Sequence, residues 1–552
     1  MKLKNILYSM MLGTAVLTSA TSCVSDLDQY PQTETTSKDV YTSLANYEAV
    51  LGKIYAAMVT SGQGKGGDNK DMESVLNKGA GFDYMRMFIN MQECGTDEFA
   101  STWLTGEQTT GLTYLSWDAN DAWVSDMYYR IYYNIALCNE FLRNANSASF
   151  SGADAEKMKE YKAEVRFMRA LFYYHALDFY RNIPMVTEND PVGSYIPPRY
   201  TPQQTFDYIE SELKDCVGDM LPASTCPYGQ ASQGAAYTLL AKLYLNSEVY
   251  TGVAKYAECK EACEKVMDMG YSLESDYSKL FNADNDKRTN EIIFALPVSA
   301  EHTVSWGSST YLVCGQLSMS NANQNVADFG VTNGWSEFRL RPEFVDKFTQ
   351  TDIDGSGDRR CKFFTNGQSK DVTSMTDETA GYLSEKWRNL KDDGTTASNT
   401  GDAGVDTDFP LFRLADVYLM YAECVVRLHN DWDNWAGGSD AESDSRKKGA
   451  IYWINKVRER AYGKGKGQVW SSNFADDDAF LQFILDERAR ELYHEGYRRT
   501  DLIRYGQFTT NKYIWQWKGG THDGQAVDSK YNIYPIPNTE LTANPNLHND
   551  NY

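Results

Sequence analysis

Apolar side chains recur at helical spacing in the segment 155–184. Val165, Met168 and Leu171 follow one another at intervals of three residues. Residues three and four apart share one face of an α-helix, so this spacing predicts an amphipathic helix with one buried stripe. Pro184 cannot continue a helix, and we expect the helix to end shortly before it.

The same spacing recurs in six further segments, and neighbouring segments form pairs. Ala235, Ala236 and Ala241 are small enough to let the two helices of one pair approach closely. Repeated antiparallel pairs are typical of tetratricopeptide-like arrays, although no strict period is visible here. The segments are about 122–144, 233–250, 254–273, 411–429, 446–463 and 477–496, and Gly496 is expected to close the last one.

The pattern changes between about residues 275 and 400. The run EIIFALPV, residues 291–298, is the best candidate for a β-strand. Long loops rich in Gly, Ser, Asn and Asp surround it, and loops of this kind commonly serve recognition. We therefore predict a mostly α fold, a tetratricopeptide-like array of helical pairs with a loop-rich, partly β insertion that forms the ligand face.

These patterns predict a single body over residues 38–552. The helical pairs occupy about 38–270 and 411–505, on either side of the loop-rich region. Residues 531–552 contain three prolines, which cannot donate to a central β-sheet. We expect this terminal segment to run over the body as an extended strap.

The N-terminal residues have the order of a bacterial lipoprotein signal. Lys2 and Lys4 precede an apolar run from Ile6 to Leu17, and small residues lead to Cys23. A run of about twelve residues is shorter than the roughly 20 that a membrane-spanning helix needs. We predict that residues 1–22 are removed, that Cys23 carries acyl chains such as palmitate, and that residues 23–37 form a tether. Because Ala20 stands where the usual motif prefers Leu, an ordinary secretory signal remains the alternative.

Charge and residue counts reduce the number of partners and sites to consider. The chain carries a formal charge of −23, and loss of Lys2 and Lys4 with the leader would leave −25. A body this acidic repels phosphate backbones, so nucleic acid is excluded as a partner. Six histidines and irregularly spaced cysteines offer little for a histidine-based metal site or a disulfide framework.

Four motifs stand out along the chain: AEVRFMRALFYYHALDFYRNIPMVTE, RLADVYLMYAEC, ILDERARELYHEGYRRTDLIRYG and YPIPNTELTANPNLHNDNY. They resemble motifs of the SusD/RagB-like outer-membrane nutrient-binding lipoproteins of Bacteroidetes. The resemblance covers nearly the whole chain, and the lipoprotein-like start fits it. His548 and Asp550 depart from the pattern of the family's ending.

The resemblance implies a non-enzymatic glycan receptor. Such a protein would be lipid-anchored in the cell outer membrane, facing outward. It would capture oligosaccharide and deliver it to a SusC-like TonB-dependent transporter. Two alternatives remain open, a helical-repeat scaffold that binds protein or peptide rather than sugar, and a surface glycoside hydrolase.

Two regions resemble the places where family members carry their binding sites. A sugar ring has an apolar C–H face that stacks on aromatic rings, and its hydroxyls need polar partners. Both needs are met in these regions, although Trp335 also fits a core anchor because a helical pattern follows it. The candidate ligand-binding residues are Asp97, Glu98 and Trp103 in the first region, and Trp306, Tyr311, Asn321, Asn323 and Trp335 in the second.

Three glutamates, Glu487, Glu491 and Glu495, share one face of the predicted helix 477–496. Two carboxylates about 5–9 Å apart could hydrolyse a glycosidic bond. Glutamates at this spacing among arginines favour an ion-pair network, with Arg488, Arg498 and Arg499 as the nearby cations. We also expect Asp486 and Arg490 to pair, since they are one helical turn apart.

The stretch TDIDGSGDRR matches the first half of a calcium-binding loop. Asp352, Asp354 and Asp358 stand at suitable positions, but Phe363 occupies the place of the bidentate acid. We expect no cofactor, and an acidic turn is the favoured interpretation, with calcium as the alternative.

Overall fold

In the computed structural model the chain divides into two compact units, residues 1–49 and 50–552. The first unit contains α2 (Ser37–Val40) and the beginning of α3 (Leu44–Ala56). The predicted signal peptide and Cys23 lie outside the described residues, as does the predicted tether up to residue 36. The structure describes residues 37–62, 64, 71–76, 82–401, 404–433, 449–550 and 552.

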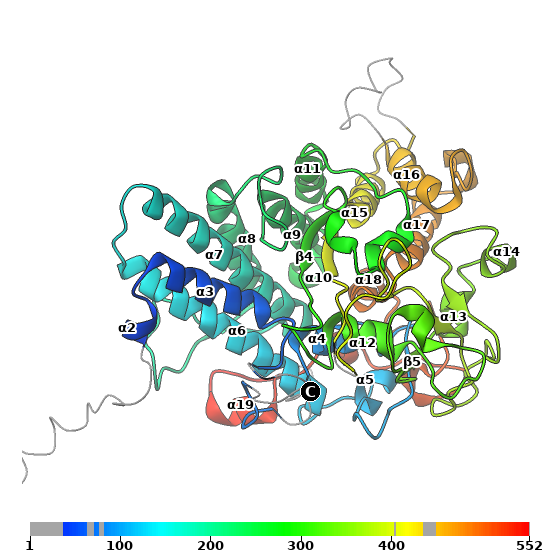
Figure 1. Cartoon of the computed structure of the whole chain (residues 1–552), viewed down its shortest axis with the longest axis horizontal. Coiled ribbons are helices and arrows are strands. Elements are labelled where there is room, and N and C mark those ends of the chain that lie inside the picture. The colour runs from blue at the N-terminus through cyan, green and yellow to red at the C-terminus, as the bar shows by residue number, and fades with distance from the viewer. Residues whose placement is uncertain are drawn as a thin grey trace, which may run out of the picture. The chain divides into compact units, whose positions relative to one another are not determined.

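The second unit is mostly helical, as Figure 1 shows. All seven segments that periodicity predicts contain long helices, whereas the helices over residues 84–93 and 202–216 lie outside the predicted segments. The principal helices are α4 (Tyr84–Glu93), α6 (Ala122–Ser147), α7 (Ala153–Tyr180), α8 (Pro202–Cys216), α9 (Gln233–Leu245), α11 (Tyr256–Met267), α15 (Leu414–Arg427), α16 (Ala450–Tyr462) and α17 (Asp477–Leu492). Shorter helices are α5 (Thr110–Tyr114), α10 (Ser247–Thr251), α12 (Ser308–Gly315), α13 (Pro342–Val345), α14 (Gln350–Ile353), α18 (Arg498–Arg504) and α19 (Asn538–Ala543).

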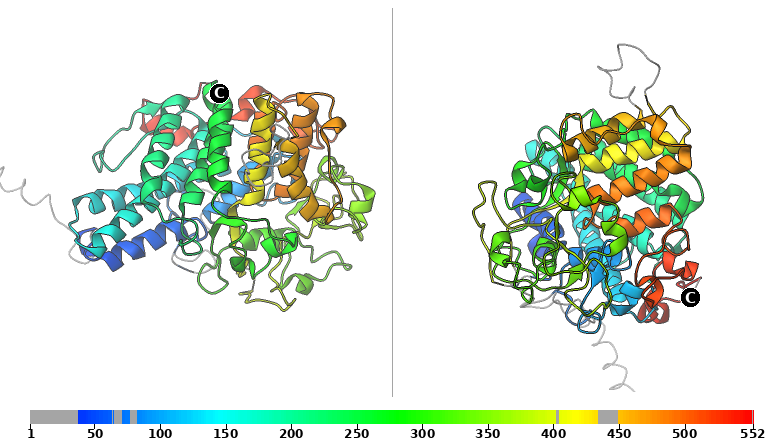
Figure 2. Two further views of the ribbon diagram at one scale, coloured as in Figure 1. Left: turned by 90° about the horizontal axis from the view of Figure 1, so that it is seen from above. Right: turned by 90° about the vertical axis from the view of Figure 1, so that its right-hand side faces the viewer.

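From α6 to α15, each long helix packs on the next one in the chain, which confirms the predicted fold class. The pairs are α6 with α7, α7 with α8, α8 with α9, α9 with α11, and α11 with α15. Both α16 and α17 then pack against α15. Seen from above, these helices stand in a row, and the green and yellow-green loops lie along one side of it (Figure 2, left). This succession of neighbouring helices is the packing of a tetratricopeptide-like array.

One strand pair joins the loop-rich region to the array. β4 (Ile292–Leu296) pairs antiparallel with β8 (Phe409–Arg413), with Leu296 opposite Phe409. β4 confirms the predicted strand, and β8 runs directly into α15. Three pairs of two-residue strands also form, β1 (Ala100–Ser101) with β5 (Phe338–Arg339), β2 (Ile183–Pro184) with β3 (Arg199–Tyr200), and β6 (Phe363–Phe364) with β7 (Leu383–Ser384).

α17 ends earlier than the sequence predicts, at Leu492 rather than at Gly496. The backbone leaves the helical conformation at Tyr493, where ψ is 143°. The Tyr493 side chain is buried, and its hydroxyl donates to the carbonyl oxygen of Arg360 at 2.9 Å. Tertiary contacts of Tyr493 therefore accompany the end of the helix before the glycine signal is reached.

The terminal segment 531–552 is held against the body, but it is not extended throughout. Tyr534 N–H donates to the carbonyl oxygen of Phe179 at 2.8 Å, and the Tyr534 side chain is buried. α19 then interrupts the extended run, and the Pro537 carbonyl oxygen accepts bonds from Glu540 and Leu541. Proline fixes φ near the helical value, so it suits the start of this short helix.

Within the described part of the chain, none of the helices combines the length and the hydropathy that crossing a bilayer requires.

Candidate functional site

A hollow in the second unit, which we call the tryptophan hollow, has a volume of about 300 Å³. This lies at the lower end of the roughly 300–1,000 Å³ typical of small-molecule sites. Three indole rings, a guanidinium group and a carboxylate line it, so apolar faces stand beside hydrogen-bonding groups. The lining residues are Phe82, Arg86, Trp103, Glu107, Trp306, Asn333 and Trp335.

Backbone pairing explains how tryptophans that are distant in sequence meet. β1 pairs antiparallel with β5, and the residue after β1, Thr102, donates its N–H to the carbonyl oxygen of Glu337 at 2.7 Å. In an antiparallel pair, each step forward on one strand is a step back on the other. The pairing therefore places Trp103 beside the loop that carries Trp335.

The indoles of the hollow are accessible to solvent. Trp103 is 37% exposed and Trp306 is 40% exposed. Trp335 is half-buried, and its ring centroid lies 6.5 Å from that of Tyr311. Single exposed apolar residues are ordinary, but three large rings around one hollow are typical of a binding surface. The structure thus brings together three of the candidate residues that the sequence predicts.

Arg86, in the first turn of α4, forms the base of the hollow. Its Nη2 donates to both carboxylate oxygens of Glu337, at 3.0 and 2.9 Å, and its Nη1 donates to the carbonyl oxygen of Trp306 at 2.8 Å. The guanidinium carbon lies 3.9 Å from the ring centroid of Phe82 and 4.4 Å from that of Tyr311. Burial alone would lower the pKa of Arg86, but the Glu337 carboxylate raises it. The residue therefore stays charged.

Glu107 places a second carboxylate beside Arg86. Its Oε2 lies 3.8 Å from Arg86 Nη2, which is too far for a hydrogen bond, and that oxygen is buried without a hydrogen-bond partner. The backbone around it is fixed, because Glu107 N–H donates to the Trp103 carbonyl oxygen and Trp123 Nε1 donates to the Glu107 carbonyl oxygen. The hollow thus contains a buried acceptor that a ligand hydroxyl could satisfy.

Sequence reasoning missed four of the lining residues. Arg86 and Phe82 lie at the start of α4, and nothing in the local pattern distinguishes them from core residues. Asn333 and Glu107 stand two and four residues from predicted tryptophans, so proximity in sequence was the available signal.

Tyr311 supports the hollow from beneath rather than lining it. It lies on α12, not on a loop, and its side chain is fully buried. The hydroxyl donates to Asn90 Oδ1 at 2.6 Å and lies 3.2 Å from Glu337 Oε1. A ligand in the hollow would meet Tyr311 only through the residues above it.

Asn321 and Asn323 lie in another loop and do not line the hollow. Asn321 is buried, and its Nδ2 donates to the Asn366 carbonyl oxygen at 2.9 Å and to Gln368 Oε1 at 3.0 Å. Its Oδ1 accepts the N–H of Asn323 at 3.0 Å. The Asn321 amide thus organises its own loop.

Asp97 and Glu98 lie in the protein interior and present no surface to a ligand. Asp97 accepts two bonds from Arg498, at 2.6 and 2.8 Å, and one from Tyr513 at 2.7 Å. Burial opposes its ionisation, but Arg498 outweighs it and holds the pKa of Asp97 below its usual value. Burial and the neighbouring Glu93 raise the pKa of Glu98.

The acids of the possible calcium loop are engaged within the protein. Asp352 accepts bonds from the N–H and hydroxyl of Thr349 and from the N–H of Asp358. Both carboxylate oxygens of Asp358 accept from Arg360. Across the residues that the structure describes, no group of three His, Cys, Asp or Glu side chains is arranged to hold a metal ion.

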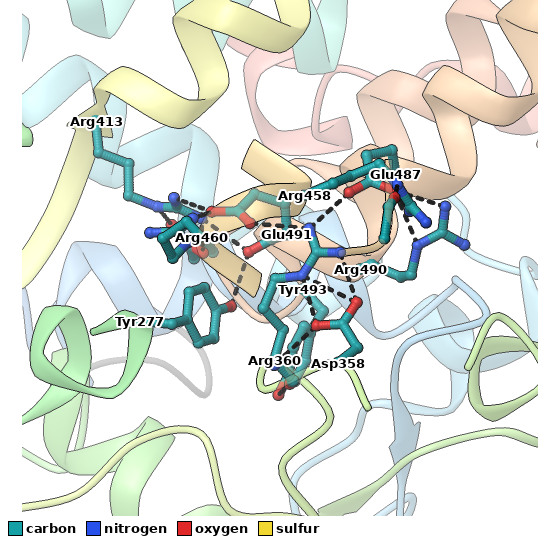
Figure 3. Close-up of polar contacts among 12 residues, drawn as sticks. Tyr277, Asp358, Arg360, Arg413, Arg458, Arg460, Glu487, Arg490, Glu491 and Tyr493 are labelled. Carbon is teal, nitrogen blue, oxygen red and sulfur yellow. Dashed lines mark hydrogen bonds and ion pairs between the residues drawn. The ribbon is translucent and has the colours of Figure 1, made fainter. Parts of the chain in front are cut away.

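The three glutamates of α17 and its C-terminal continuation form a buried ion-pair network. Figure 3 shows the part of it around Glu487 and Glu491. Arg360 donates to Glu487 at 2.8 Å and to Glu491 at 3.0 Å. Arg413 donates to Glu495 at 2.7 and 2.8 Å and also to Glu491. A general acid in glycoside hydrolysis needs a raised pKa, whereas the pKa of Glu491 is lowered, so Glu491 is unsuited to that role. Burial would raise its pKa, but Arg460, Arg413 and Arg360 lower it to about 2.

The predicted partners within this network are wrong. Arg488 pairs with Asp416 and Asp501, and Arg498 pairs with Asp97. Arg499 likewise pairs with Asp178 rather than with the glutamates. Asp486 pairs with Lys347 rather than with Arg490, which bonds Glu487. Apart from Arg490, which lies on α17 itself, the cations that meet Glu487 and Glu491 come from distant segments. They are Arg360, Arg413, Arg458 and Arg460.

Comparison with known proteins extends over the full chain. Residues 362–552 match a family described as the SusD family, and residues 27–245 match one described as starch-binding and associating with the outer membrane. The starch-binding protein SusD of Bacteroides thetaiotaomicron is 33% identical to this chain, over 99% of both chains.

Two solved structures share the fold. A SusD homologue from Bacteroides thetaiotaomicron has a TM-score of 0.70 at 18% identity and covers 94% of this chain and 98% of its own. The surface glycan-binding protein A of that species, solved with laminarihexaose, has a TM-score of 0.65 at 16% identity and covers 92% and 99%. With one third of its residues identical to SusD along its whole length, the chain belongs to the SusD/RagB family.

Proposed function

We propose that this chain is a surface-exposed glycan-binding lipoprotein that captures oligosaccharide in the tryptophan hollow. The observation that carries the proposal is the convergence of Trp103, Trp306 and Trp335 on one hollow. Indole faces stack on the C–H faces of sugar rings, while Arg86 and Glu107 offer polar partners for hydroxyl groups. The names of the relatives, which include a starch-binding and a glycan-binding protein, support a glycan as the ligand.

The charges around the hollow favour an uncharged glycan. One guanidinium group, that of Arg86, faces two carboxylates, those of Glu337 and Glu107. The whole chain is also acidic, with a formal charge of −23. A uronic acid or sulfate group would add negative charge to this environment and would be repelled.

The proposal includes anchoring through Cys23 and delivery to a partner. Each buried CH₂ of an acyl chain contributes about 0.8 kcal/mol, so several chains on Cys23 would hold the body at the outer membrane, facing outward. The captured oligosaccharide would pass to a SusC-like TonB-dependent transporter. The outer-membrane association named in the family description supports this location.

The anchor is tested by mass spectrometry of the mature N-terminus. A first residue Cys23 bearing acyl chains is expected, and Cys23→Ala should release the protein into the soluble fraction. An unmodified N-terminus at another position would contradict the anchor.

Binding is tested on a panel of neutral and acidic oligosaccharides by isothermal titration calorimetry. Trp306→Ala and Trp103→Ala should each weaken binding at least about tenfold, which is about 1.4 kcal/mol. Trp470→Ala is the matched control, because Trp470 is 58% exposed but lies outside the hollow.

Two outcomes would reject the proposal. Saturable binding to peptides with none to sugars would favour the scaffold alternative. Release of new reducing ends from a polysaccharide would show hydrolysis, which the proposed receptor does not perform.

A further inference from the structure

The loop that carries Trp306 is fixed through its backbone rather than through its indole. The ring is 40% exposed, yet Ser305 and Ser308 on either side are almost fully buried. Ser308 has φ 49°, a left-handed conformation that non-glycine residues rarely adopt. Such a conformation persists only where the surrounding contacts determine it.

Those contacts come from Asp83, the N-cap residue of α4. Its Oδ1 accepts the N–H of Arg86 at 2.9 Å, which caps the helix, and also the N–H of Ser308 at 3.0 Å. Its Oδ2 accepts the hydroxyl of Ser305 at 2.6 Å. Arg86 adds a bond of 2.8 Å to the Trp306 carbonyl oxygen. Three of the four residues 305–308 are thus tied to the first turn of α4.

Gly307 shows how closely the loop approaches Asp83. Its backbone is extended, with φ −131° and ψ −157°, so any residue could adopt its conformation. However, a Cβ atom at Gly307 would lie 2.2 Å from Asp83 Oδ1. A side chain at this position would therefore force the loop away from the cap.

We propose that Asp83 is a positioning residue for glycan binding, which fixes Trp306 at the hollow through Ser305 and Ser308. Asp83 is fully buried and does not line the hollow, so it acts through the residues that it positions. The inference rests on the proposed function, because it assigns a role in forming the same glycan site. Phe82, directly before Asp83, and Arg86, in the first turn of α4, both line the hollow. The start of α4 therefore positions Phe82, Arg86 and, through Asp83, Trp306.

The test compares Asp83→Ala with Asp83→Asn. Alanine removes all three bonds, whereas asparagine keeps an oxygen for the two N–H groups and can donate to Ser305 Oγ. With maltohexaose as the probe in calorimetry, we expect affinity about tenfold lower for Asp83→Ala and near wild type for Asp83→Asn. Asp476→Ala is the control, because Asp476 caps α17 through Ala479 and lies away from the hollow.

A second readout follows the indole itself. With 5-fluorotryptophan incorporated, the ¹⁹F resonance of Trp306 is assigned by its loss in Trp306→Phe. Asp83→Ala should shift or broaden that resonance while those of tryptophans outside the hollow stay in place. Gly307→Ala should give the same change, and Gly218→Ala, where a Cβ meets open space, should not.

A double-mutant cycle separates positioning from general destabilisation. If Asp83 acts through Trp306, adding Asp83→Ala to Trp306→Ala should lower affinity no further. Wild-type affinity in Asp83→Ala, an unchanged Trp306 resonance, or fully additive losses would each overturn the inference. The proposed function would instead fail if wild type bound no glycan or if Trp306→Ala bound as well as wild type.

Discussion

Around α17, buried carboxylates meet several guanidinium groups, whereas around the tryptophan hollow some polar and aromatic groups are left without protein partners. Glu487 and Glu491 are each bonded by Arg360 and by other cations. In the hollow, Glu107 Oε2 is buried without a hydrogen bond, and the indole of Trp306 faces solvent. Both regions contain arginine and glutamate, so residue type alone does not separate them.

The difference shows where each region contributes free energy. A buried charge that lost its partner would cost several kcal/mol, so breaking the α17 network by removing one partner would destabilise the folded chain. A group that already lacks a partner gains one only when a ligand arrives, so the hollow is suited to recognition. In the hollow, the Glu107 Oε2 acceptor stands beside exposed indole rings, and this combination favours binding.

Removing Arg413 should have the largest effect of all, a loss of stability that originates in the α17 network. Arg413→Met would remove the cation that contacts all three of Glu291, Glu491 and Glu495. Arg460 would remain beside Glu291 and Glu491, and Lys386 beside Glu495. We expect the free energy of unfolding to fall by about 3–5 kcal/mol, measured by urea denaturation. Lys159→Ala, which removes an exposed ion pair with Asp219, is the control and should change the midpoint little. Equal midpoints for Arg413→Met and wild type would show that the network does not stabilise the fold.

Acid should have the second-largest effect, because it protonates buried carboxylates of α15 and α17 that pair with arginines. The pKa of Glu491 is lowered to about 2 from a usual value of 4.5, and Glu423 is lowered likewise by Arg504 and Arg427 against the effect of burial. Each group therefore contributes stability above about pH 4.5 that is lost as pH falls toward 2. A single group accounts for about 3 kcal/mol. Urea midpoints between pH 6 and 2.5 measure this loss, and a flat profile would contradict it.

Trp335→Ala should lower both the affinity for glycan and the stability of the folded chain. The ring lines the hollow, and it also packs near Tyr311 and over Arg86. We expect about tenfold weaker binding of maltohexaose together with a loss of about 1–2 kcal/mol in stability. Trp306→Ala should show the binding loss without the stability loss, and identical thermal unfolding of the two variants would remove the distinction.

Glu107→Gln should have the smallest effect and should reduce the preference of the hollow for uncharged glycans. The substitution removes a negative charge from the lining while keeping an oxygen for a ligand hydroxyl. Affinity for a glucuronate-containing oligosaccharide should rise several-fold, and that for maltohexaose should change little. Glu301→Gln, on an exposed side chain outside the hollow, is the control. An unchanged ratio of the two affinities would show that charge does not select the glycan.

The helices could be predicted from the sequence because their signal is local. Spacing of three and four residues located α6 and α7, and the apolar run at 291–298 located β4. The end of α17 could not be predicted, since Tyr493 leaves the helix where it contacts Arg360, a residue 133 positions away.

The candidate site could be predicted only in part. Trp103, Trp306 and Trp335 were selected by ring chemistry, which is visible in the sequence, and they converge. Asp97 was selected by the same logic, but its charge is met by Arg498, 401 residues away. Whether an acid is available to a ligand depends on such distant partners, which the sequence does not display.

The pairing of β1 with β5 has a consequence for how such proteins diversify. Backbone groups make that pairing, so the pairing itself does not depend on which side chains stand at positions 103 and 335. If the hollow binds glycan as proposed, substitutions at these two positions would change the rings that meet a sugar while the strands stay paired. Related chains could then differ in the sugars they bind and keep the same helical scaffold.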